Sequence, residues 1–107
     1  MRDTVVANKY ALALFQLAEE NNLVDQIEEQ LKVVKEVFNQ EKDFETFLTS
    51  PKIGKDTKRE LIKDAFGELN PFILNTLLLL LDRQRVQYIT TVIDEFIEVS
   101  YESKGIA

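Results

Sequence analysis

Apolar side chains recur every three or four positions along most of this chain, a spacing that places them on one face of a helix. The clearest case runs from about Leu23 to Gln40, where the apolar residues step by 3, 4, 3 and 4 positions: Val24, Ile27, Leu31, Val34 and Phe38. Charged residues occupy the opposite face, and Glu28 and Lys32 stand in the i,i+4 order that stabilises a helix. The pattern predicts an amphipathic helix over this segment.

Residues with strong positional preferences mark where other helices begin and end. A first helix is expected to run to about Glu20, because Asn21-Asn22 can adopt the left-handed conformation that ends a helix. Asn70-Pro71 is expected to open another, with Asn as the N-cap and Pro at the first helical position. Together with the apolar periodicity, these signals predict helices at about 3–20, 23–40, 42–48, 55–66, from 71 and from about 85.

Short connections between these segments predict that sequential helices pack as neighbours. The expected fold class is therefore all-α, a six-helix bundle over residues 1–104. Its shared core is expected to contain six large apolar side chains: Leu31, Phe47, Leu61, Leu77, Ile93 and Phe96. Residues 105–107 are expected to begin a linker to a C-terminal domain that is absent from this sequence.

Charge and hydropathy bear on which partners are possible. The formal net charge of −6 argues against nucleic acid, because phosphate binding needs a basic surface. One basic cluster lies between Lys52 and Lys63, but acidic residues are interleaved with it, which is typical of a solvated helix face. Apolar runs such as Leu77–Leu81 are far shorter than the roughly twenty residues that a membrane-spanning helix needs. We therefore expect no nucleic acid partner and no direct membrane insertion.

The residue types that catalysis and cofactor binding need are missing. The chain has no His, the commonest general base and metal ligand, and no Cys to supply a thiolate. It has no G-x-x-x-x-G-K-[ST] loop for a nucleotide phosphate. The adjacent pair Glu28-Glu29 diverges by about 100° on a helix, so its carboxylates do not converge on one atom. The sequence predicts a non-catalytic protein with no metal site and no cofactor.

The first and fifth helices are unusually apolar. Between Val5 and Ala18, and again between Phe72 and Leu81, only a few positions are polar. A helix that is apolar nearly all round is normally buried nearly all round, yet a domain of this size has room to enclose about one such helix. Two of them suggest that part of the apolar surface is covered by another protein. The alternative, that both helices are simply central in the bundle, stays open on the pattern alone.

Tyr10 is the candidate anchor on this surface, because its ring is large and apolar and its tip is polar. Its neighbours three and four positions away are Val6, Ala7, Ala13 and Leu14. They predict a shallow strip floored by small residues, which suits an amphipathic helix laid along it.

Three segments resemble a known family in the order in which that family carries them. The run from Val6 to Ala18 resembles the opening of the δ subunit of bacterial F-type ATP synthase, which is related to the mitochondrial oligomycin-sensitivity-conferring protein. The run from Leu48 to Ile53 resembles the family's Leu-x-Ser-Pro-x-Ile segment. The run from Asn75 to Arg85 resembles the family's Asn-x-Leu…Asn-x-Arg segment, although Arg83-Gln84 stands where the family often has Asn-Gly.

The resemblance implies a non-catalytic stator subunit, which resists rotor torque during proton-driven ATP synthesis. It implies a six-helix domain on top of the catalytic head that binds the N-terminal amphipathic helix of an α subunit between its first and fifth helices. The implied partner-binding residues are Val6, Ala7, Tyr10, Ala13, Leu14, Asn75, Thr76, Leu79 and Asp82. The absent C-terminal domain would contact the b subunit of the peripheral stalk. The implied location is the cytoplasmic face of the bacterial cell membrane, as a peripheral part of the complex.

Two other classes of function remain open. A generic helical adaptor could bind an amphipathic helix in another complex, but it has no reason to carry three ordered motifs. A helical enzyme subunit could hold a cofactor between its helices, but the lack of His and of a phosphate loop counts against it.

Overall fold

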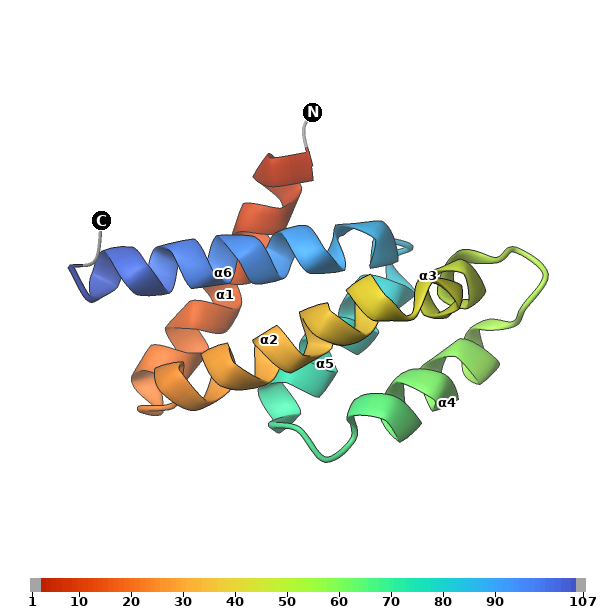
Figure 1. Ribbon diagram of the computed structural model, residues 1–107, viewed down its shortest axis with the longest axis horizontal. Coiled ribbons are helices and arrows are strands. Elements are labelled where there is room, and N and C mark those ends of the chain that lie inside the picture. Colours follow the sequence, from red (N-terminus) through yellow and green to blue (C-terminus); the bar gives the residue numbers. More distant parts are fainter. Residues whose placement is uncertain (1–2, 106–107) are drawn as a thin grey trace.

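Helices account for most of the chain (Figure 1). The structure is a computed structural model that describes residues 3–105, with side chains from Thr4 onward. The elements in chain order are α1 (Asp3–Glu20), α2 (Val24–Gln40), α3 (Lys42–Thr49), α4 (Lys55–Phe66), α5 (Pro71–Asp82), the 3-10 turn η1 (Val86–Tyr88) and α6 (Ile89–Ser103). Residues 3–105 contain no strand, so the predicted all-α fold of six helices is confirmed. The sixth helix begins later than the predicted Arg85, because η1 precedes it. Of the expected linker, residues 106–107 lie outside the described range.

Local sequence signals set the helix ends. Asn22 has a φ of 58°, the left-handed conformation expected where α1 ends. The amide of Leu23 then donates to the carbonyl of Ala18 at 2.8 Å, which satisfies one of the last carbonyls of α1. At the start of α5, the side-chain oxygen of Asn70 accepts from the amide of Phe72 at 2.8 Å, as the N-cap prediction requires.

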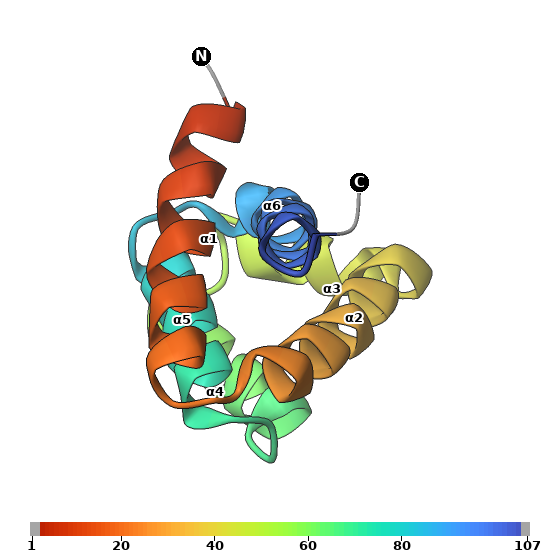
Figure 2. The same cartoon turned by 90° about the vertical axis from the view of Figure 1, so that its left-hand side faces the viewer.

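The centre of the fold is the crossing of α1 and α6, which Figures 1 and 2 show from two directions. Ala7, Ala11 and Ala18 on α1 are completely buried. Such small side chains let two helix axes approach closely. Phe15 of α1 fills the space beside them and meets Phe96 of α6 edge to face, with ring centroids 5.6 Å apart. Most of the alanines on α1 therefore serve the interior of the bundle.

A second group of side chains ties α3 and α4 to α2. The rings of Phe38, Phe44 and Phe66 come from these three helices and lie 5.1 to 6.3 Å apart. Phe38 and Phe66 are buried, and Phe44 packs against them at the edge. This aromatic cluster gives the short helix α3 an apolar contact that its eight residues could not supply alone.

The predicted core is largely confirmed. Four of the six expected residues are buried, namely Leu31, Leu77, Ile93 and Phe96. The other two, Phe47 and Leu61, are half-buried and pack against the core from its margin.

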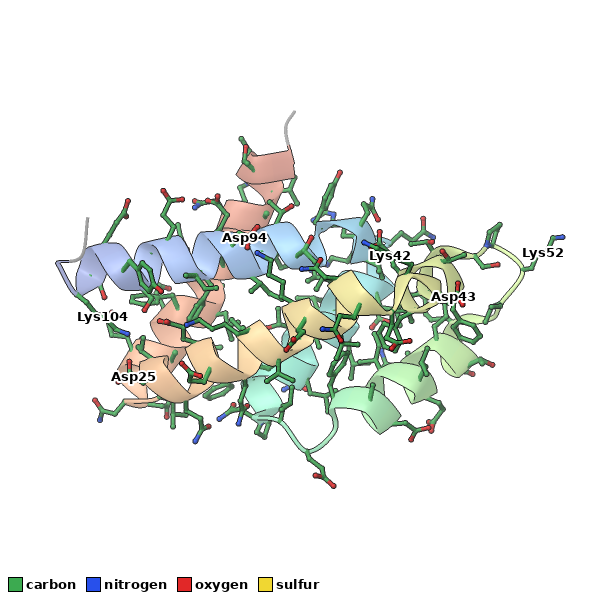
Figure 3. The ribbon with its side chains drawn as sticks, viewed as in Figure 1. Asp25, Lys42, Asp43, Lys52, Asp94 and Lys104 are labelled. Carbon is green, nitrogen blue, oxygen red and sulfur yellow. The ribbon has the colours of Figure 1, made fainter. Side chains whose placement is uncertain are left out.

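A buried polar contact joins α2 to the end of α6. Glu28 and Ser100 are both buried, and the Ser100 hydroxyl donates to Glu28 Oε1 at 2.6 Å. Lys104 Nζ lies 3.3 Å from the same oxygen and 2.8 Å from Asp25 Oδ1. Figure 3 shows Asp25 and Lys104 together at this end of the molecule. Burial alone would raise the pKa of Glu28, but hydrogen bonds from Ser100, Lys104 and Lys32 and the charge of Lys104 outweigh it, so the pKa is lowered.

Glu28→Gln is expected to lower the free energy of unfolding at neutral pH by roughly 1 to 3 kcal/mol, because it removes a buried charge that the Ser100 hydroxyl and two lysines stabilise. Since the folded pKa of Glu28 is lowered, its contribution is present above the unfolded pKa and is lost as pH falls through the folded pKa. The difference between wild type and variant should therefore shrink in acid. Chemical denaturation at several pH values measures it.

Glu29→Gln is the matched control on the same helix, because Glu29 is exposed and meets Lys32 only at 3.7 Å. It should change the unfolding free energy by less than about 1 kcal/mol. Equal effects of the two substitutions at every pH would contradict the role given to Glu28.

Candidate protein-binding surface

Large apolar side chains are exposed on α1 and α5. Among the described residues, Val5, Leu12 and Leu17 of α1 are 58%, 42% and 40% exposed, and Leu79 of α5 is 39% exposed. The two helices contact each other and run in opposite directions along one side of the molecule (Figure 2). Together they place apolar surface in solvent on the two helices that the sequence singled out.

Tyr10 fixes which face of α1 lies toward α5. Its hydroxyl oxygen accepts hydrogen bonds from Arg85 at 2.7 Å and Arg83 at 3.2 Å, in the turn after α5. Val6, Ala13 and Leu17 follow the helical spacing from Tyr10, so they lie on that same face of α1.

The hydrogen bond from Arg83 to Tyr10 likewise shows which face of α5 lies toward α1. Leu79 precedes Arg83 by four positions and Thr76 precedes it by seven, so all three share a face. We call the combined area the α1–α5 surface and define it by six residues: Val6, Tyr10, Ala13 and Leu17 of α1 with Thr76 and Leu79 of α5.

Val5 and Leu12 lie on a different side of α1. They share the helical spacing of Asn8, whose side-chain amide donates to Glu95 of α6 at 3.0 Å. The exposed apolar residues of α1 are therefore divided between a side near α5 and a side near α6.

The structure places five of the nine expected binding residues on the α1–α5 surface. Tyr10, Val6 and Thr76 are half-buried, while Ala13 and Leu79 are exposed. Leu17 belongs to the same surface and was missed, although its spacing of seven from Tyr10 could have revealed it.

Two expected residues lie beneath the surface instead of on it. Ala7 and Leu14 are only 0% and 1% exposed. Their side chains lie on the face of α1 that points into the core, where they pack against the other buried residues. Both side chains are therefore shielded from solvent.

Asp82, at the end of α5, is paired with α4. Arg59 Nη1 of α4 donates to both carboxylate oxygens of Asp82, at 2.7 and 2.9 Å. Lys55 Nζ donates to the Asp82 carbonyl at 3.3 Å, which places a cation at the end of α5 where the helix dipole favours it. Asn75 is exposed and precedes Leu79 by four positions and Asp82 by seven, so it borders the α1–α5 surface on the side of Asp82. Part of the basic cluster thus connects α4 to α5.

The turn after α5 orients both arginines toward Tyr10. Gln84 adopts a φ of 59°, the left-handed region that glycine favours, at the position where the resembled family often has Gly. The Arg85 amide donates to the Leu80 carbonyl at 2.8 Å, which closes the turn. The Arg85 guanidinium also lies 5.8 Å from the centre of the Tyr10 ring.

The arginines also change the acidity of Tyr10. Partial burial opposes ionisation of the phenol, but the hydrogen bonds and charges of Arg83 and Arg85 outweigh it and lower the pKa of Tyr10. The phenol oxygen is therefore held in one position by two cationic donors.

A separate cavity of about 530 Å³ lies away from this surface. It is bounded by the loop between α3 and α4, the end of α5 and η1, with Leu48, Ile53, Lys58 and Val86 among its lining residues. The described part of the chain holds no group of three acidic, His or Cys side chains arranged to bind a metal ion. None of its helices is both long and apolar enough to cross a bilayer.

Comparison with known proteins relates the chain to one protein family over nearly its whole length. Residues 6–107 match the family described as ATP synthase delta (OSCP) subunit. The ATP synthase subunit delta of Priestia megaterium is 40% identical over 107 residues, which cover 100% of this chain and 59% of that protein. That of Bacillus subtilis is 43% identical over 100 residues, covering 94% of this chain and 55% of that protein. The chain thus spans somewhat more than half the length of these relatives.

Proposed function

The chain belongs to the family of ATP synthase delta (OSCP) subunits, and on that basis we propose that it binds the N-terminal amphipathic helix of an α subunit on its α1–α5 surface. The observation that carries the proposal is the exposure of Leu17 and Leu79 on the same helix faces as the half-buried Tyr10 and its partner Arg83. An amphipathic helix would cover these side chains with its own apolar face, which removes both from water.

The shape of the surface supports a helix as the occupant. Ala13 lies between Tyr10 and Leu17 on the same face of α1, and its small side chain leaves room for a second helix to approach. Because α1 and α5 are antiparallel and Arg83 reaches Tyr10, we place Leu79, one turn before Arg83, beside Ala13, one turn after Tyr10. A groove floored by a small residue and flanked by larger apolar ones is a common setting for helix recognition.

The proposed role is mechanical. A rotor turning inside the catalytic head exerts a reaction torque on the head, and the head would rotate with it unless something holds it. A subunit that binds the top of the head and a membrane-anchored stalk prevents this rotation, and its activity then consists of binding energy alone. An interface of about 800 Å² per partner is of the size found in nanomolar complexes.

We propose that the contact with the stalk is made by a part of the subunit other than the six helices. The relatives are longer than the chain, which covers 59% of the Priestia megaterium protein. We propose that a second domain contacts the peripheral-stalk b subunit and that the assembly lies at the cytoplasmic face of the bacterial membrane as a peripheral component.

Replacing either large side chain of the surface should weaken binding without unfolding the bundle. Tyr10→Ala and Leu79→Ala are each expected to reduce the affinity for a peptide copying the α-subunit N-terminus by about thirtyfold, since removing a buried anchor costs roughly 2 kcal/mol. Calorimetric titration gives the affinity, and thermal unfolding shows whether the midpoint stays within a few degrees of wild type.

Leu12→Ala is the matched control, because Leu12 has nearly the same exposure as Leu79 but lies on the other side of α1. Its affinity for the peptide should remain within about twofold of wild type, as expected of a residue outside an interface. Unchanged affinity in Tyr10→Ala and Leu79→Ala, or an equal loss in Leu12→Ala, would place the binding site elsewhere.

A further inference from the structure

One end of the α1–α5 surface is positively charged although the chain as a whole is acidic. Arg83 and Arg85 both point their guanidinium groups at Tyr10, at the end of the surface where α5 finishes. The formal net charge of the chain is −6, so a pair of converging arginines differs from its surroundings. This end therefore attracts an anionic group while the rest of the α1–α5 surface is apolar.

The two arginines have no anionic partner within the described residues. The ion pairs of residues 3–105 involve Lys32, Lys35, Arg59 and Lys104, but neither Arg83 nor Arg85. Both guanidiniums instead share the neutral oxygen of Tyr10. Each guanidinium carries five N–H donors, so most remain available after one bond to the phenol. Two like charges on one neutral acceptor repel each other, and a carboxylate beside them would relieve that repulsion.

Covering the surface with an apolar helix would make the repulsion worse. The helix would displace water from Tyr10 and its neighbours, and the two guanidiniums would lose part of their solvation. An oppositely charged group on the helix offsets that loss, whereas an apolar residue at the same place does not.

We propose that the helix bound on the α1–α5 surface carries an aspartate or glutamate whose carboxylate is held by Arg83 and Arg85. This inference rests on the proposed function, because it names the chemistry of the helix that occupies the same surface. Arg83 follows Leu79 by four positions, about one helical turn. The carboxylate therefore lies one to two turns along the partner helix from the apolar residue that packs against Leu79.

The arginine pair also sets the direction of the bound helix. The α1–α5 surface has its cationic group at one end only, so a helix with a single acidic end gains from one orientation and not from the reverse. Apolar contacts supply affinity, and the charge pair supplies direction.

The test uses a synthetic peptide of roughly 20 residues copying the N-terminus of the α subunit from the same organism, about 30 Å long as a helix. Its affinity is measured by calorimetry for the wild-type chain, for Arg83→Gln, for Arg85→Gln and for the double variant, at low and high salt. Lys63→Gln is the control, because it removes one positive charge from the exposed face of α4. Thermal unfolding of each variant checks that the bundle is intact.

The double variant is expected to bind about tenfold more weakly at low salt, and the wild-type affinity should fall with salt while that of the variant does not. Lys63→Gln should behave as wild type. A second peptide with its acidic residues replaced by the corresponding amides should bind wild type and double variant equally.

Two results would overturn the inference, and they are distinguishable. If the natural peptide binds the wild-type chain and the arginine variants bind it equally well, the carboxylate contact is wrong and the proposed function stands. If the natural peptide does not bind the wild-type chain at all, the proposed function is wrong and the inference fails with it.

Discussion

Ala13→Asp is expected to abolish measurable binding of the α-subunit peptide and to leave the bundle folded. Ala13 is exposed, so an aspartate there is hydrated in the free chain and costs little stability. In the complex the same carboxylate would be covered by an apolar helix face without a partner, and burying an unpaired charge costs several kcal/mol. A loss of more than about a hundredfold in affinity corresponds to about 3 kcal/mol, which is within that range.

Ala11→Asp makes the same chemical change two positions away and should have the opposite consequence. Ala11 is completely buried in the face of α1 that packs in the core. A carboxylate there has neither space nor solvent. The expected loss in free energy of unfolding approaches the roughly 5 to 15 kcal/mol that typically stabilises a whole domain. We therefore expect nearly all of the native helix content to be lost. Circular dichroism distinguishes the two variants before any binding experiment. Two unfolded variants would show that Ala13 belongs to the core, and a folded Ala13→Asp with native affinity would remove it from the interface.

Phe96→Ala is expected to be the most destabilising truncation of a single side chain in the core. Phe96 is completely buried on α6 and meets Phe15 of α1 edge to face, so its removal opens a cavity at the crossing of the two central helices. Truncating a buried phenylalanine to alanine typically costs about 3 to 5 kcal/mol. For a chain of this size, each kcal/mol lowers the thermal midpoint by roughly 4 to 8 °C, so the midpoint should fall by well over 10 °C.

Tyr101→Ala provides the comparison on the same helix. Tyr101 is 38% exposed and lies outside the buried core. Its replacement should cost clearly less than the roughly 3 to 5 kcal/mol expected for Phe96→Ala, because more than a third of its surface is already in contact with water. A small effect of Phe96→Ala, or similar effects of both substitutions, would contradict the central place given to the α1–α6 crossing.

The sequence was sufficient for the elements whose determinants are local. Asn22 ends α1 in a left-handed conformation, and Asn70 caps α5 through its own side chain, so both boundaries depend on residues next to them. The alternation of apolar and charged positions in α2 likewise fixes its inner face, with Ile27, Leu31 and Val34 buried as predicted.

The orientation of α1 was beyond sequence reasoning for a physical reason. In a helix that is apolar nearly all round, the spacing of apolar residues does not show which face is buried, because every rotation about the helix axis buries some of them. Ala7 and Leu14 were therefore expected on the binding surface, while the structure buries them in the core. The pairing of Asp82 with Arg59 was also beyond sequence reasoning, because it depends on where α4 packs, which no local pattern encodes.

The surroundings of Tyr10 depend on both local sequence and tertiary packing. The sequence identified it as a candidate anchor on an apolar helix, and the structure places it half-buried on the side of α1 that faces α5. Its two arginine partners lie more than seventy positions later in the chain. Their convergence depends on the antiparallel packing of α1 and α5, which residue types do not specify.

The most direct test of the account is to titrate the isotopically labelled chain with the α-subunit N-terminal peptide and follow the amide chemical shift of every residue. We expect the largest changes at the residues of the α1–α5 surface: Val6, Tyr10, Ala13, Leu17, Thr76 and Leu79. Changes confined to the separate cavity, around Leu48, Ile53 and Val86, would contradict it, as would a spectrum that the peptide leaves unchanged.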